Sequence, residues 1–79
     1  MVIKLIEEGS VIEEIITTKS RFSVDGVDYI LIRSESDNGT RTWLGETENS
    51  LVEDMSWTDE FELIHDQIIE FAEDNDINI

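Results

Sequence analysis

A two-residue turn signal about a third of the way along the chain constrains the fold more than any other feature. Asp25-Gly26 lies between Phe22-Ser23-Val24 and Val27-Asp28-Tyr29, two segments rich in β-branched and aromatic residues. Asp-Gly is favoured in two-residue hairpin turns, in which both residues adopt a positive φ. The sequence therefore predicts an antiparallel hairpin centred on these two residues.

The segment that follows this turn has the pattern of a central strand. The run that leads to Arg33 is apolar on both faces, with Tyr29 and Leu31 on one and Ile30 and Ile32 on the other. A second turn, at residues 36–39, leads into residues 40–44, and Gly45 ends that segment. The middle of the chain is thus predicted to be a meander of three strands.

The secondary structure of the N-terminal part is less clearly predicted by the sequence. Residues 1–6 and 11–18 are rich in Val, Ile and Thr and are predicted to pair as strands joined at Glu8-Gly9. Ser10 followed by Glu13 also fits a capping box, so a short helix over residues 10–18 is the alternative. After a polar connection over residues 46–50, a helical turn opened by Ser50 and Glu53 is expected.

The C-terminal part has a helical period. From Thr58 to Asp74 the apolar residues recur every three to four positions, and Ser56 or Thr58 is the expected cap. The apolar face that would cover one side of the sheet consists of Phe61, Ile64, Ile68, Phe71 and Ala72. The predicted fold is α+β: residues 1–79 form a single acidic domain in which an antiparallel meander of three to five strands packs against one C-terminal α-helix.

The other face of this helix carries a row of carboxylates. The spacing of three, four, four and three residues places five acids within one stripe about 80° wide. We call this set the acidic stripe; it consists of Asp59, Glu62, Asp66, Glu70 and Glu73. Like charges at these spacings each cost roughly 0.2–0.5 kcal/mol, and anions at a helix C-terminus oppose the helix dipole. Helix stability therefore does not explain the stripe. The apolar residues Leu63 and Ile69 are predicted to project beside it.

The charge of the whole chain is equally uneven. The net charge is −15; residues 1–41 contain all five Lys and Arg with eight acids, whereas residues 42–79 contain twelve acids and no Lys or Arg. Such a surplus destabilises a compact state through self-repulsion and points to solubility, salt adaptation or a cationic partner. There is no cysteine, signal peptide or membrane-length apolar run, so a cytoplasmic protein without membrane contact is expected.

Catalytic and metal-binding readings find little support in the sequence. His65 is the only histidine, and its Glu62-x-x-His65 pair lacks the second pair that a di-iron site requires. We therefore predict no enzymatic activity, no catalytic residue, no metal site and no cofactor. Trp43, on a strand, and Trp57, at the helix start, are interpreted as packing residues, although either could anchor a partner.

The functional hypothesis is that the carboxylates imitate a phosphate backbone. A row of carboxylates can occupy a Lys- and Arg-lined DNA-binding groove without base readout, because such a groove is built to neutralise phosphates. The predicted partner is a basic DNA-binding host protein, and the chain itself is not expected to bind nucleic acid. The predicted partner-binding residues are Glu53, Asp54, Asp59, Glu62, Asp66, Glu70, Glu73, Asp74 and Asp76, with Glu46 and Glu48 nearby.

In its small size, acidity, lack of cysteine and acidic Asp59–Asp76 segment, the chain resembles phage-encoded DNA-mimic inhibitors, a functional class with unrelated folds. The resemblance implies an inhibitor of an HU-type nucleoid protein, as in Bacillus phages, or of a nuclease, a uracil-DNA glycosylase or a polymerase, acting in the host cytoplasm. Two alternatives stay open: an acidic immunity- or antitoxin-like protein that neutralises a basic partner, and a structural or assembly subunit. The sequence also leaves open a homodimer that combines two acidic faces.

Overall fold

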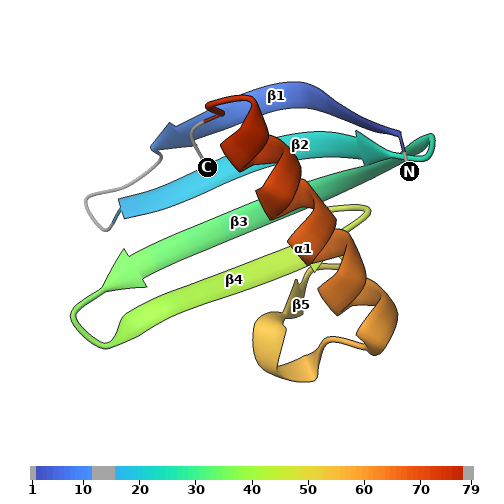
Figure 1. Ribbon diagram of the computed structural model, residues 1–79. Coiled ribbons are helices and arrows are strands. Elements are labelled where there is room, and N and C mark those ends of the chain that lie inside the picture. The colour runs from blue at the N-terminus through green and yellow to red at the C-terminus, as the bar shows by residue number, and fades with distance from the viewer. Residues whose placement is uncertain (1, 12–15, 78–79) are drawn as a thin grey trace.

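The computed structural model describes residues 2–11 and 16–77, in which one α-helix lies diagonally across one face of a five-stranded antiparallel sheet (Figure 1). Its elements are β1 (Ile3–Val11), β2 (Ile16–Val24), β3 (Val27–Ser36), β4 (Gly39–Gly45), β5 (Val52–Glu53), the 3₁₀ turn η1 (Asp54–Ser56) and α1 (Asp59–Asp74). The order of the strands in the sheet is their order in the chain. The predicted α+β meander with a C-terminal helix is thereby confirmed.

The β2–β3 hairpin forms where the Asp-Gly signal predicts it. Val24 pairs with Val27, so the turn has two residues, and Asp25 (φ 52°) and Gly26 (φ 85°) both adopt the positive φ of a type I′ turn. In the β3–β4 hairpin, Gly39 likewise has a positive φ, of 116°. These two turns fix the register of the three central strands.

The β1–β2 pairing differs from its prediction. Glu8-Gly9 does not form a turn: β1 continues to Val11, which pairs with Thr18. The register instead shifts between Glu7 and Ser10, so this segment is an irregularity within the strand, which is a common role of glycine in strand interiors. Both ends of the alternative helix over residues 10–18 are strand, and residues 12–15 of that prediction lie outside the described residues.

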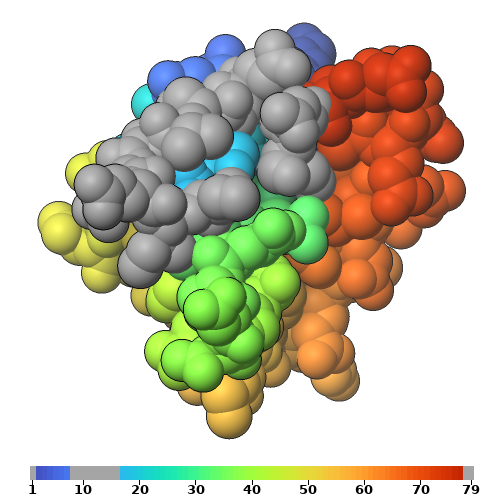
Figure 2. Space-filling model, turned by 90° about the vertical axis from the view of Figure 1, so that its left-hand side faces the viewer, coloured from blue at the N-terminus to red at the C-terminus, as the bar shows by residue number. Residues whose placement is uncertain are grey.

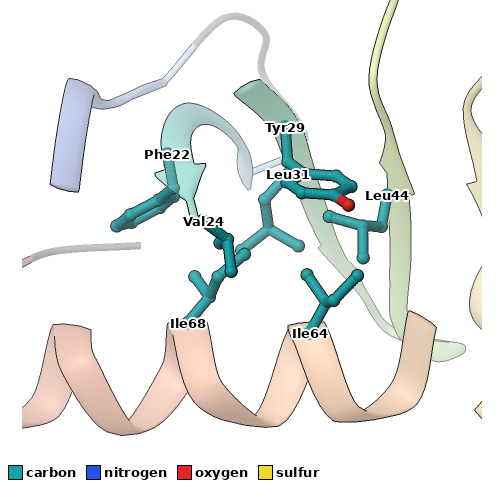
Figure 3. Packing of buried hydrophobic residues seen from close by; sticks show 7 residues of the cluster. All are labelled: Phe22, Val24, Tyr29, Leu31, Leu44, Ile64 and Ile68. Atoms are coloured by element: carbon teal, nitrogen blue, oxygen red, sulfur yellow. The ribbon is translucent and has the colours of Figure 1, made fainter. Parts of the chain in front are cut away.

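The core lies between the sheet and α1. Side chains from β2, β3 and β4 point toward two isoleucines of the helix (Figure 3). The buried cluster consists of Phe22, Val24, Tyr29, Leu31, Leu44, Ile64 and Ile68. Two edge-to-face aromatic pairs extend it at the helix, Phe22 with Phe71 and Tyr29 with Phe61. In all, one face of the sheet and one face of the helix supply the core.

The segment between β4 and α1 contains a strand as well as a helical turn. Val52 and Glu53 pair with Leu44 and Trp43 as β5, and the helical turn that follows is the 3₁₀ turn η1. Ser50 does not open this turn, because its hydroxyl bonds to the backbone of Thr47. The helical turn expected from Ser50 and Glu53 thus begins later, at Asp54, and has no side-chain cap.

Thr58 caps α1, as one of the two predicted caps. Its hydroxyl accepts a hydrogen bond from the backbone N–H of Phe61, at 3.3 Å. The predicted apolar face is buried or half-buried throughout. Ile69 was predicted to project beside the acidic stripe, but it is half-buried and packs against the core, whereas Leu63 is 52% exposed. None of the helices in the described parts of the chain has the length and apolarity needed to span a membrane.

α1 ends in a Schellman motif. The backbone N–H of Ile77 donates to the carbonyl of Ala72 (2.8 Å), and that of Asp76 donates to the carbonyl of Glu73 (3.4 Å). Asp76 occupies the left-handed position of the motif with φ 53°. Ile77 packs against the core, which anchors the motif.

Replacing Asp76 with glycine should stabilise the protein by about 1 kcal/mol, because glycine adopts a positive φ without strain and an anion is removed from a helix C-terminus. Chemical denaturation followed by circular dichroism measures the change. Asn75→Gly is the matched control and should lower stability, since Asn75 has φ −114° and its side chain donates to the carbonyl of Phe71. Equal effects of the two substitutions would contradict this account.

Candidate functional site: the acidic face of the helix

The acidic stripe forms the outer surface of α1. All five of its side chains are exposed, on the side of the helix opposite Ile64 and Ile68. From Asp59 to Glu73 the stripe extends for about 21 Å at the rise of an α-helix. The structure thus places five of the predicted partner-binding carboxylates side by side on one rigid element.

No cation of the sheet neutralises this surface. Among the described residues, no Lys or Arg forms an ion pair with a carboxylate of α1, and the last turn of the helix carries no basic residue. Within residues 2–11 and 16–77, the one ion pair at the stripe is between neighbours, His65 and Asp66 (Nδ1–Oδ1 3.4 Å), and it requires a protonated imidazole. The stripe therefore keeps its negative charge available for an external partner.

The cations lie mostly on the other face of the sheet. Residues paired across antiparallel strands share a face, so the register places Lys4, Lys19, Arg21 and Arg41 opposite the face that α1 covers. Figure 2 shows α1 forming one side of the molecule, with the segment after β4, in yellow, on the other. The molecule is therefore electrostatically two-sided.

Acidic residues on that second face form ion pairs with these cations. Glu48 pairs with Lys19, and the hydrogen bond and charge of that lysine lower the pKa of the Glu48 carboxyl. Glu53 faces Arg41, with Nε and Oε1 3.9 Å apart. Glu46 and Glu48 line a small hollow with Lys19. Glu48 and Glu53 are thus separated from the acidic stripe by the sheet, although the sequence groups them with it, whereas Glu46 lies close enough to Tyr29 to act on its hydroxyl together with Glu60 of α1.

Asp54 does join the stripe. It lines a groove between η1 and α1 that we call the Trp57 groove, with a volume of about 500 Å³. The lining residues are Asp54, Met55, Trp57, Glu62, His65 and Asp66. Trp57 is held in place because its Nε1–H donates to the carbonyl of Val52 (2.7 Å), and it packs against the core as predicted.

The two remaining predicted residues lie at the other end of the helix. Asp74 is exposed and shares a hollow with Glu70 and Phe71, whereas Asp76 is exposed in the Schellman motif just beyond the helix. Both extend the negative surface past Glu73. Trp43, in contrast, is half-buried on the sheet face that α1 does not cover, outside the buried core cluster.

Burial, followed by the charges of Glu46 and Glu60, raises the pKa of Tyr29, whose ring is part of the core. Within residues 2–11 and 16–77, no group of three His, Asp or Glu side chains is placed to hold a metal ion.

Sequence reasoning missed the Trp57 groove. The contact between the Trp57 and His65 rings, whose centroids are 4.9 Å apart, joins residues eight positions apart on different elements. The available signal was the sequence Asp54-Met55-Ser56-Trp57, an apolar pair among acids immediately before the helix cap.

Comparison of the chain with protein-family models, with curated proteins and with solved structures found no match.

Proposed function

We propose that this protein is a non-enzymatic inhibitor that mimics DNA and occupies the basic DNA-binding site of a host protein, such as an HU-like nucleoid protein or a nuclease. The observation that carries the proposal is the acidic stripe: five exposed carboxylates on one helix face with no Lys or Arg paired to them among the described residues. Asp54 and Asp74 extend this surface at the two ends.

The physical basis is competition for cations. A protein that binds duplex DNA neutralises a row of phosphates with Lys and Arg and releases condensed counterions. The stripe is about 21 Å long, the axial rise of roughly six phosphates along one strand. Carboxylates held on a helix that is packed against a sheet lose little conformational freedom on binding, so a rigid row is a better competitor than a disordered acidic tail.

The alternative role of the stripe, keeping a small protein soluble, does not require this arrangement. Surface acids interspersed with Lys would give solubility without repulsion at i, i+3 and i, i+4 spacing. Here the four cations on the uncovered sheet face could not relieve that repulsion, because the sheet separates them from α1. The segregation of charge favours a partner-binding face.

The direct test is a pull-down from bacterial lysate with this protein as bait, with and without excess duplex DNA. We expect capture of a basic DNA-binding protein and its displacement by the duplex. In the reverse assay, this protein should release a labelled duplex from the purified partner, with an affinity that weakens steeply as salt is raised. A partner whose binding is unaffected by DNA and by salt would rule out mimicry.

An acidic immunity-like protein is the second candidate, and one observation favours it. Met55 is 89% exposed beside Asp54, which gives the acidic surface an apolar contact of the kind that anchors protein–protein interfaces. Capture of a basic toxin that remains bound in excess duplex DNA would support this function over DNA mimicry.

A further inference from the structure

The Trp57 groove differs in chemistry from the rest of the acidic surface. One part of its lining is apolar, from the 89% exposed thioether side chain of Met55 and the half-buried indole of Trp57. The other part is anionic, from Asp54 on η1 and from Glu62 and Asp66 on α1. The groove has a volume of about 500 Å³, is open to solvent and presents both kinds of lining to one incoming side chain.

The aromatic part of the groove is rigid. The Trp57 indole is fixed at one end by the hydrogen bond from Nε1–H to the carbonyl of Val52, and its ring contacts the His65 ring at an interplanar angle of 42°. Thr58, the next residue, caps α1. The groove is therefore held in shape by β5 and by the start of the helix before any partner arrives.

We infer that the Trp57 groove binds an arginine side chain of the partner. This inference rests on the proposed function, because it assigns the contact by which a DNA-binding groove would be engaged. Charge complementarity selects a cation: three carboxylates line the groove, and among the described residues none of them is paired with a Lys or Arg, although Asp66 has its neighbour His65 at 3.4 Å.

Arginine fits this lining better than lysine does. A guanidinium is planar, more weakly hydrated than an ammonium, and able to stack on an aromatic ring while its five N–H groups donate to carboxylates on either side. The arginine methylenes would cover Met55, which is otherwise left in water. An ammonium is a compact, strongly hydrated charge, so it would use the carboxylates and gain less than a guanidinium from the ring.

The test is an NMR titration of the whole protein with N-acetyl-arginine methylamide, and with the lysine and citrulline analogues at the same concentrations. Arginine should shift the Trp57 indole N–H and the His65 ring resonances, with saturation in the millimolar range. The Trp43 indole N–H, on the opposite face of the sheet, is an internal reference and should not move. Citrulline, which has the same shape without the charge, should have no effect.

Two paired variants, each with two substitutions, test where on the protein arginine binds. Glu62→Gln with Asp66→Asn should weaken arginine binding about tenfold or more. Glu73→Gln with Asp74→Asn removes the same charge from the other end of α1 and should leave the affinity within about twofold. All four side chains are exposed, so both variants should fold.

Three results would overturn the inference: equal affinity for lysine and arginine, equal shifts at Trp43 and Trp57, or equal losses in the two paired variants. The titration contains neither DNA nor a partner protein, so it is independent of the DNA-competition assay. Failure of the competition assay with a positive titration would leave the arginine site standing and remove DNA mimicry. A positive competition assay with a negative titration would support DNA mimicry and refute the arginine site in the groove.

Discussion

Replacing Phe22 with alanine should destabilise the protein by about 3–5 kcal/mol, a large share of the roughly 4–12 kcal/mol expected for a domain of this size. Phe22 has 0% exposure, lies at the centre of the face that α1 covers, and makes an edge-to-face contact with Phe71 at 6.3 Å. The substitution leaves a cavity beneath the helix and removes an aromatic pair. Urea denaturation followed by far-UV circular dichroism measures the loss.

The matched control is Leu63→Ala, which truncates another large apolar side chain, on the 52% exposed surface of α1. It should cost less than about 1 kcal/mol, because little apolar area returns to water. Similar losses at Phe22 and Leu63 would mean that the helix does not pack on the sheet in this way.

Reversing three charges of the acidic stripe should abolish partner binding without unfolding the protein. In the variant Glu62→Lys, Asp66→Lys, Glu70→Lys, three contacts with the partner's cations become repulsive. At about tenfold per contact, affinity should fall by about a thousandfold or more. The three side chains are exposed and the net negative charge decreases, so the fold should be retained or stabilised. Affinity for the DNA-displaceable partner is the measurement, with circular dichroism to check the fold.

A control with the same net charge separates the stripe from overall acidity. Asp28, Glu35 and Asp37 are exposed on β3 and on the turn that follows it, outside the acidic stripe, and their replacement by lysine changes the charge equally. This second variant should keep most of the partner affinity, apart from a weaker long-range attraction. If both variants lose binding to the same extent, net charge and not the stripe determines recognition.

The turns and the helix start, which depend on neighbouring residues in the sequence, could be predicted. Those strand pairings that depend on contacts between distant segments could not. The Asp25-Gly26 hairpin and the start of α1 at Thr58 follow from backbone preferences of the residues themselves. The Glu8-Gly9 pair was misread because glycine occurs both in turns and in strand irregularities, and only pairing with β2 distinguishes the two. β5 has two residues, too few for any periodic pattern to appear.

The candidate site shows the same division. Helical spacing alone placed the acidic stripe on one face, because all its members belong to one element. Glu53 could not be assigned correctly, because its side depends on pairing with Trp43 across β4 and β5. The Trp57 groove required the path of the chain from β5 through η1 to α1, which no local preference determines.

The meander has a consequence for folding in the cell. Every strand pairs with its neighbour in the chain, so the sheet contacts can form as the chain leaves the ribosome. The helix that covers Phe22, Leu31 and Leu44 is synthesised after all five strands. A nascent chain of which only the residues before 59 have emerged would hold a paired sheet with its apolar face exposed to water. Chaperone binding or aggregation of this protein should therefore concentrate in the interval between completion of β5 and emergence of α1.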